Sequence, residues 1–523
     1  MPGILDSEKV ARLVTLVEEA SRSSEEGVKH FVEPAPGTLS RATNRRHHIV
    51  FGRRGSGKSS LLLKAASDLT VDRRPIAHVN QEAFKGHSYP DVLLSVLIST
   101  FEAFDRWMKS AAVYRSTRKS FWTKLFGTAP TRPAYNRKEA EKLSDRLHQQ
   151  VREVQAELHR TDDADLTVTS AAEADEKATA GVRVKVGSTG PSAEIGAQAE
   201  SALRESQQVE EKYRRSKTDF LHRHILDYQA TFRQLAELSD GDAYLFLDDL
   251  YHIRRLDQPM VVDYFHRIAK DQKLWLKIGT IRHRTRWYTH GDPPVGMKIG
   301  DDADEIDLDL TLEKYSLAKD FLVRILTNFA KTVDVASIGE FLTDGAVDRL
   351  VLASGGVARD FLSIFRRSVV VARERGGGHR GDRVGAEDVN VAAGEYDTSK
   401  REEFKRDTLG DDVSLESEFQ KLRRFCLDEN NTNCFLLDKE QRGSEVELIH
   451  ELMDLKLIHL VRSRVTVSGR RGSLFEAYML DLSQYAGARK RRKLDMIEFW
   501  RPSSNEALRR VSLIYAPNGG PPA

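Results

Sequence analysis

The order of apolar and polar positions predicts alternating strands and helices in the first three hundred residues. Four short runs that are mostly apolar are typical of buried strands. These runs are residues 47–51, 75–80, 243–247 and 274–280. Apolar positions at helical spacing follow the first three runs, at 59–69, 89–108 and 259–270. Apolar strands separated by helices indicate a parallel sheet that is covered on both faces, so we predict an α/β fold.

The alternation stops for about a hundred residues between the second and third strands. Residues 137–160 and 200–238 are charged, and each segment carries one apolar stripe at helical spacing. They predict an antiparallel helical hairpin of coiled-coil type, inserted at about 109–215. The connecting segment is rich in small residues and leaves two alternatives for the tip, a small β structure or a partly disordered insertion.

The remainder of the chain predicts two further units. Residues 313–333, 343–354 and 357–375 have helical spacing and predict a helical lid. Beyond Leu415, two helical segments precede apolar stretches around a Ser-Gly-Arg-Arg-Gly-Ser turn, which is the order of elements in a winged helix. The predicted organisation is an N-terminal helical segment at 1–40, an α/β core at 41–310, the lid at 311–400, the winged helix at 412–485 and a basic tail at 486–523.

A glycine-rich turn between the first strand and the first helix carries the clearest chemistry. Residues 52–59, Gly-Arg-Arg-Gly-Ser-Gly-Lys-Ser, fit the phosphate-loop pattern GxxxxGK[ST] in the strand–loop–helix context that the pattern requires. In such a loop, backbone amides and the N-terminus of the following helix bind phosphates. We expect Lys58 to bridge the β- and γ-phosphates of ATP, and we expect Ser59 to bind Mg²⁺. The alternative is a chance glycine turn. The residues expected to bind the nucleotide are Gly52, Gly55, Ser56, Gly57, Lys58, Ser59 and Ser60.

An acidic pair ends the third predicted strand, in the sequence Leu-Phe-Leu-Asp-Asp at 245–249. A carboxylate beside a phosphate loop suits Mg²⁺, so we expect Asp248 to hold the metal together with Ser59. Asp249 is the expected catalytic base, at the position where many ATPases of this architecture carry Glu. Because Asp is one methylene shorter, we expect slow turnover. The alternative is that Asp249 only caps the next helix.

With these two motifs the chain resembles the AAA+ ATPases, most closely the branch of origin-recognition-complex-type initiators. The resemblance covers most of 41–485, except the insertion, and implies a P-loop parallel sheet with a helical lid and a C-terminal winged helix. It also implies that Thr280, at the end of the fourth strand, senses the γ-phosphate. Arg359, which follows the glycine turn Ser-Gly-Gly at 354–356, is implied as the sensor arginine of the lid. Either residue could instead be a packing or salt-bridging residue.

Three arginines, Arg282, Arg284 and Arg286, follow the fourth strand beside Trp287 and Tyr288. By analogy with the family, one of them could reach the nucleotide of a neighbouring subunit. They could also grip nucleic acid, or form a solvated charge run. The sequence does not single out one of these arginines.

The presumed recognition helix of the winged helix, at 444–457, is acidic. Its net charge is −3, from four carboxylates and one lysine, which fits poorly in a DNA groove. Any DNA contact is therefore expected from the wing, through Arg470 and Arg471, and from the basic run Arg489–Lys493. The alternative is a winged helix that docks on proteins and packs on the ATPase core.

Composition narrows the choice of compartment and partner. The 523 residues hold 81 Lys and Arg against 79 Asp and Glu, so bulk charge would not hold a polyanion. Cys426 and Cys434 are too few for a disulfide scaffold, and with His450 they fit no standard metal spacing, so we expect them to be buried. No apolar run reaches the ~20 residues of a membrane span, and the N-terminus is unlike a signal peptide. We therefore expect a cytoplasmic protein with no membrane partner.

Two hypotheses of function follow. The first is an ATP-dependent switch, slowly hydrolysing ATP to ADP and phosphate, whose nucleotide state controls DNA engagement or assembly with itself or a protein partner. The second is a regulatory P-loop protein of signalling or defence systems, in which the nucleotide is mainly structural and the helical hairpin and winged helix bind proteins.

Overall fold

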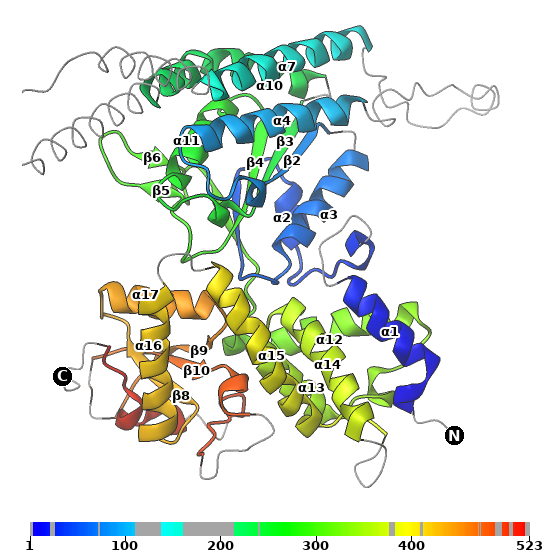
Figure 1. Cartoon of the computed structure of the whole chain (residues 1–523), viewed down its shortest axis with the longest axis vertical. Coiled ribbons are helices and arrows are strands. Elements are labelled where there is room, and N and C mark those ends of the chain that lie inside the picture. Colours follow the sequence, from blue (N-terminus) through cyan, green and yellow to red (C-terminus); the bar gives the residue numbers. More distant parts are fainter. Residues whose placement is uncertain are drawn as a thin grey trace, which may run out of the picture.

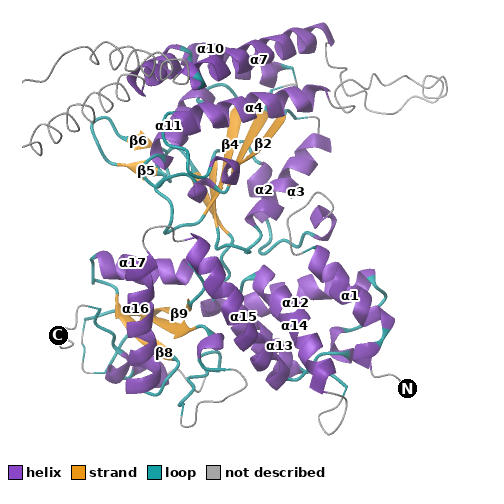
Figure 2. Cartoon of the chain, viewed as in Figure 1, coloured by secondary structure: helices purple, strands orange, loops and turns teal. Residues whose placement is uncertain are grey.

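The computed structural model has an α/β core with its helical hairpin at one end, and the lid and the winged helix side by side at the other (Figure 1). Figure 2 shows that strands are confined to the core and the winged helix, whereas the lid is helical. The structure describes residues 4–20, 27–71, 74–109, 137–160, 214–238, 241–375, 382–407, 412–468, 470, 472–486, 494–501 and 506–517.

Five parallel strands form the sheet of the core, in the order β2-β3-β4-β1-β7. Their bounds are β1 (His48–Phe51), β2 (Ile76–Asn80), β3 (Ala243–Asp248), β4 (Leu274–Thr280) and β7 (Asp304–Asp307). The first four strands match the apolar runs of the sequence, and the prediction of a parallel α/β sheet is confirmed. The fifth, β7, was not predicted, because its sequence Asp-Glu-Ile-Asp has a single apolar residue.

Helices cover both faces of this sheet. The connections from β1 to β2 and from β2 to β3 cross the sheet in opposite directions, and right-handed crossovers then put their helices on opposite faces. These helices are α3 (Lys58–Val71), after β1, and α4 (Asp91–Lys109), after β2; α11 (Gln258–Ala269) connects β3 to β4. All six residues of β3 are consequently buried, which explains why this strand is apolar up to its terminal aspartate.

The predicted insertion contributes a helical layer above α4. Helix α7 (Arg137–Leu158) packs on α4 and runs antiparallel to the helical segment that ends in α10 (Ile225–Glu237). Two hydrogen bonds fix this direction: Gln150 donates to Thr231 at 2.8 Å, and Arg160 donates to Ser216 at 3.1 Å. The base of the hairpin is thus antiparallel as predicted, and the predicted tip lies outside the described residues.

The lid is a bundle that includes the N-terminal helix. Its elements are α12 (Tyr315–Thr332), α13 (Asp344–Ser354), α14 (Ala358–Arg375) and α15 (Ala386–Asp407). Helix α1 (Glu8–Glu19) packs on α12 and α14 and buries Val10, Leu13 and Val17. The apolar stripe of α1 therefore belongs to the core of the lid.

The C-terminal unit is a winged helix with a three-stranded sheet in the order β8-β10-β9. Its elements are α16 (Asp412–Arg424), β8 (Cys434–Asp438), α17 (Ser444–Asp454), β9 (Ile458–Val465) and β10 (Phe475–Leu480). The presumed recognition helix, α17, ends three residues earlier than predicted, because Lys456 has a left-handed backbone with φ 64°. Both cysteines are buried thiols, as expected.

The described part of the predicted basic tail folds back on the winged helix. The backbone N–H of Tyr515 donates to the Leu436 carbonyl of β8 at 2.8 Å, and the Tyr515 hydroxyl donates to Glu418 at 2.7 Å. The N–H of Ile497 donates to Asn433 at 2.9 Å. The basic run Arg489–Lys493 lies outside the described residues, so the expected DNA contact of this run stays a prediction.

Candidate nucleotide site

The phosphate loop connects β1 to α3 and turns sharply at its glycines. Gly55 has φ 88° and Gly57 has φ 100°, backbone conformations that favour glycine. A Cβ atom on Gly55 would also lie 2.7 Å from the Cβ atom of Arg359 in the lid. The loop therefore requires glycine both for its path and for its close contact with α14.

Lys58 and Ser56 supply buried polar atoms beside this loop. The side chain of Lys58 is buried, and its Nζ donates to the Gly52 carbonyl at 2.8 Å. Burial lowers the pKa of Lys58, while the charges of Asp249 and Asp248 act to raise it. Within the described residues, the Oγ atom of Ser56 is buried with no hydrogen-bond partner. A buried hydroxyl and a buried ammonium beside a turn of backbone amides fit a bound phosphate group.

Asp248 reaches the loop across one intervening strand, since β4 lies between β1 and β3. Its carboxylate is buried and accepts a hydrogen bond from the Ser59 hydroxyl. Burial raises the pKa of Asp248, and the Ser59 hydrogen bond and the Lys58 charge partly oppose this. Gly279 on β4 makes room for the carboxylate, because a Cβ atom there would lie 2.5 Å from Asp248 Oδ1. The two expected Mg²⁺ ligands are thus neighbours, and their oxygen donors suit that ion.

Asp249 faces a cavity of about 210 Å³ that Lys58 and Ser59 also line. It precedes the short 3-10 helix η4 (Leu250–His252) with a left-handed backbone, φ 59°. Its side chain makes no capping hydrogen bond to η4, so the capping alternative is wrong. Burial raises the pKa of Asp249, and the charge of Asp248 raises it further.

An apolar wall of this cavity comes from the lid and the N-terminal segment. Apolar and aromatic side chains that line it are His30, Phe31, Val32, Phe321, Ile325, Phe329 and Leu362. The rings of His30 and Phe329 lie 5.1 Å apart between centroids. No motif in residues 1–40 marked this segment as part of a site. An apolar wall and a polar phosphate loop in one cavity suit a ligand with an aromatic base and a phosphate chain.

The two expected sensor residues lie in different surroundings. Arg359 lines the cavity, and its backbone N–H donates to the Gly55 carbonyl at 3.2 Å. Thr280 is buried, and its hydroxyl shares a 2.5 Å hydrogen bond with the Thr285 hydroxyl, while its carbonyl accepts from the Gly52 N–H at 3.2 Å. The structure therefore brings Arg359 to the cavity and places Thr280 behind the loop. Their sensor roles stay predictions.

The arginine run after β4 packs on the core. The Arg282 guanidinium lies 4.0 Å from the centre of the Phe51 ring and forms ion pairs with Glu305 at 3.0 Å and Asp307 at 3.3 Å. Arg284 lies 5.7 Å from the centre of the Tyr251 ring, which also lines the cavity. Arg282 is thus a salt-bridging residue that packs on the core, whereas the alternative of the sequence analysis was a solvated charge run.

Helix α17 of the winged helix docks on the α/β core. Arg255 pairs with Glu451 at 3.0 Å, and the backbone N–H of His283 donates to Asp454 at 3.0 Å. The rings of His283 and His450 stack with centroids 4.9 Å apart. Glu451 and Asp454 of α17 therefore contact the α/β core, as in the alternative of a winged helix that packs on the core, and docking on other proteins stays a prediction.

A direct contact path joins the phosphate loop to the winged helix through the glycine turn of the lid. Arg53 of the loop is buried, donates to the Gly355 carbonyl at 3.0 Å, and pairs with Asp309 at 3.1 Å. Gly355 packs on His459 of β9 so closely that a Cβ atom would lie 2.1 Å from the ring. The lid turn is thus held between the loop and the winged helix.

Buried charges hold the lid against the winged helix at the same place. Lys400 of α15 lies 2.7 Å from Asp481 and 3.9 Å from Asp360, and Lys456 lies 3.1 Å from Asp360. His459 shares a 2.8 Å hydrogen bond with Asp481. Burial alone would raise the pKa of Asp481, but the Lys400 charge holds it well below its usual range. Asp360 directly follows Arg359, so the cavity and this ion cluster share the first turn of α14.

Fold and site together define a P-loop α/β protein with a helical lid and a winged helix. No protein-family model matches the chain, and no curated protein matches it. Among solved structures, the chain is similar to the Aeropyrum pernix ORC1 protein in complex with DNA, with 14% identity, 91% of this chain and 89% of that chain covered, and a TM-score of 0.31. In the described ranges, no helix has the length and apolar character needed to cross a membrane.

Proposed function

We propose that this protein is an ATP-binding switch that hydrolyses ATP slowly to ADP and phosphate. The observation that carries the proposal is a single cavity lined by Lys58 and Ser59 of the loop and by Arg359 of the lid, with Asp248 hydrogen-bonded to Ser59. The resemblance of the phosphate loop and the acidic pair to AAA+ ATPases of the origin-recognition-complex type supports the same class.

Each polar group of the site has a role in this proposal. The amides of residues 52–57 and the Lys58 ammonium bind the β- and γ-phosphates, and Lys58 gives up its bond to the Gly52 carbonyl to do so. Ser59 and Asp248 hold Mg²⁺, which neutralises phosphate charge when it is bound. Asp249, which also lines the cavity, orients the water that attacks the γ-phosphate, and the apolar wall around Phe329 contacts the base.

The nucleotide state reaches the winged helix through the lid. Arg359 lines the cavity, and its neighbour Asp360 is held by Lys400 and Lys456. A γ-phosphate that draws the arginine toward the loop therefore pulls on a turn that is fixed to the winged helix. Packed interfaces of this kind respond to a ligand by shifting between discrete arrangements.

Substitution of Lys58 tests the nucleotide site. Loss of one charge-assisted phosphate contact costs about 1.5–3 kcal/mol, so Lys58→Ala should weaken Mg²⁺·ATP binding about 10- to 150-fold. Lys64→Ala, on the same helix but in an i,i+4 pair with Asp68, is the matched control and should bind as wild type does. Wild-type protein that binds no ATP, or a Lys58→Ala variant that binds equally well, would refute the proposal.

DNA is the proposed partner, through the wing. Arg470 lies in the wing turn, and the sequence adds further positive charge at Arg471 and Arg489–Lys493. Glu451 and Asp454 of acidic α17 contact the core. Binding of duplex DNA should weaken as salt rises, should differ between ATP and ADP, and should fall when Arg470 and Arg471 are both changed to Ala. A titration in both nucleotides at several salt concentrations measures all three effects.

The docked α17 favours one second candidate, a protein-binding switch. A helix that is held on the core by Glu451 and Asp454 is released for other partners if the nucleotide weakens those contacts. This candidate is tested by a pull-down from the host with and without nuclease, in ATP and in ADP. Recovery of a protein partner that survives nuclease treatment and depends on the nucleotide, together with no salt-dependent DNA binding, would favour it.

A further inference from the structure

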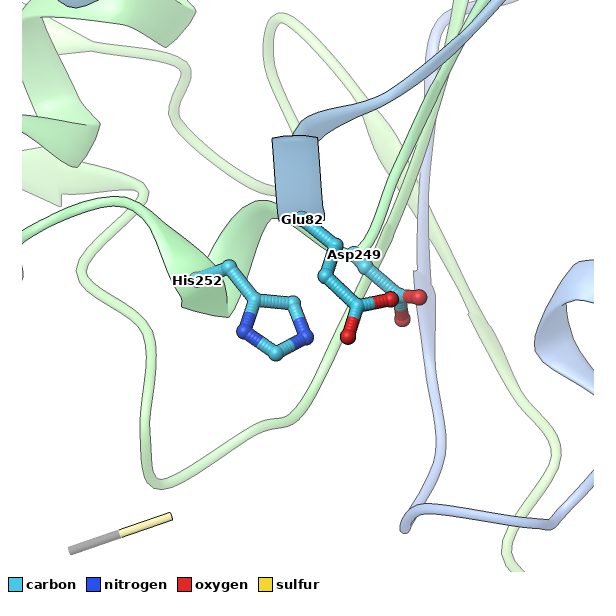
Figure 3. Close-up of side chains that lie close together, drawn as sticks. All are labelled: Glu82, Asp249 and His252. Atoms are coloured by element: carbon cyan, nitrogen blue, oxygen red, sulfur yellow. The ribbon is translucent and has the colours of Figure 1, made fainter. Parts of the chain in front are cut away.

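A second carboxylate lies beside Asp249 in the nucleotide cavity. The ligand atoms of Glu82, Asp249 and His252 all lie within 4.8 Å of one another, and Figure 3 shows the three side chains converging. All three residues line the same cavity as Lys58 and Ser59. Glu82 belongs to no motif that the sequence revealed.

The local fold presents Glu82 at this point. Strand β2 pairs with β3, and Asn80 at the end of β2 is in register with Asp248. The Asn80 side chain accepts a hydrogen bond from the Glu82 N–H at 2.9 Å and thereby caps the 3-10 helix η3 (Gln81–Phe84). Helices η3 and η4 therefore lie side by side at the carboxyl edge of the sheet, where Glu82 of η3 and Asp249, which directly precedes η4, both line the cavity.

Glu82 has two properties that Asp249 lacks. Its side chain is longer by one methylene, and it is exposed, whereas Asp249 is partly buried. A general base must reach the water that attacks the phosphate and must return its proton to solvent. The longer and more accessible carboxylate suits both tasks better than its shorter neighbour.

We propose that Glu82 is a catalytic base of the ATPase reaction, with Asp249 and His252 fixing the water beside it; this inference rests on the proposed function. The water oxygen forms a bond to the γ-phosphorus while the bond from that phosphorus to the bridging oxygen breaks, and the electron pair of the broken bond leaves with ADP. Glu82 accepts the proton that the water loses and releases it to solvent. ATP and water are consumed, and ADP, phosphate and a proton are formed.

The test measures binding and turnover separately. Affinity for Mg²⁺·ATP is titrated, and hydrolysis is followed under saturating ATP, for wild type, Glu82→Gln and Glu82→Asp. Glu82→Gln should lower kcat about 100-fold or more while the dissociation constant changes by less than about twofold. Glu82→Asp should fall between the two, because it keeps the carboxylate and loses reach. Glu139→Gln, exposed in the first turn of α7, is the matched control and should keep wild-type values.

The outcomes separate this inference from the proposed function. If wild-type protein binds no ATP, the proposed function fails and the inference fails with it. If wild-type protein binds ATP but does not hydrolyse it, the inference is overturned and the proposed function is reduced to ATP binding. If wild-type protein hydrolyses ATP, a Glu82→Gln variant with wild-type kcat overturns the inference alone. It is also overturned if Glu82→Gln loses affinity and turnover together, because Glu82 would then serve binding and not the chemical step.

Discussion

The buried carboxylate of Asp454 makes the docking of the winged helix depend on pH. Asp454 lies on α17 and accepts the backbone N–H of His283 from the core at 3.0 Å. Burial raises the pKa of this carboxyl from 3.8 to about 7, and the charge of Asp309 acts in the same direction. The docked protein therefore holds a proton on Asp454 at a pH at which the unfolded chain has lost it.

The sign and size of the effect follow from this difference in pKa. Between about pH 4 and pH 7 the folded state binds more protons than the unfolded state, so stability falls as the pH rises through that window. The contribution of the neutral carboxyl is complete below the unfolded pKa and lost above the folded one. A difference of about three pH units in pKa corresponds to about 4 kcal/mol.

Asp454→Asn isolates this contribution, because an amide oxygen can accept the same hydrogen bond and carries no charge. Relative to wild type, the variant should gain about 3 kcal/mol in free energy of unfolding between pH 5 and pH 8. Urea unfolding at both pH values measures the difference. Asp320→Asn, exposed on α12, is the matched control and should show no such gain. Parallel pH profiles for wild type and Asp454→Asn would refute the reasoning.

Two further substitutions test the contact between the lid and the winged helix. Gly355→Ala should lower the free energy of unfolding by more than the about 1–2 kcal/mol that an alanine in the left-handed conformation costs, because its Cβ atom would collide with His459. Gly472→Ala is the control in urea unfolding, because Gly472 has φ 92° and no atom of the described residues near its Cβ position, so only the conformational cost applies there. Lys400→Met should lower the free energy of unfolding by about 3–5 kcal/mol, because the buried carboxylates of Asp360 and Asp481 lose a cation. Lys331→Met, at an exposed position, should lower it little, and equal losses for the two variants would contradict a stabilising role of the buried ion pairs.

The sequence predicted the parts of the fold whose burial is uniform. β1, β3 and β4 are buried along nearly their whole length, so apolar runs identify them. β7 is an edge strand with one buried residue among four, and nothing in Asp-Glu-Ile-Asp separates it from a polar loop. The same limit applies to the end of α17, which is set by a left-handed Lys456 and not by a change in apolar pattern.

The candidate site likewise has one part that the sequence predicted and one part that it did not. The phosphate loop and the acidic pair are local motifs, because backbone geometry fixes their spacing along the chain. The apolar wall at His30, the space made by Gly279 and the carboxylate of Glu82 come from distant segments that only the folded sheet and lid bring together. No periodicity within those segments carries that information.

The acidity of α17 follows from where the winged helix is docked. A helix that enters a DNA groove has to be neutral or basic, whereas α17 presents Glu451 to Arg255 and Asp454, whose pKa is raised by burial, to the core. Release of α17 would add negative charge to the surface that DNA would meet, so DNA binding and undocking oppose each other. A nucleotide switch that favours DNA should therefore move the lid and the winged helix together, with α17 kept on the core. The ion cluster around Lys400 provides the rigid link that this movement needs.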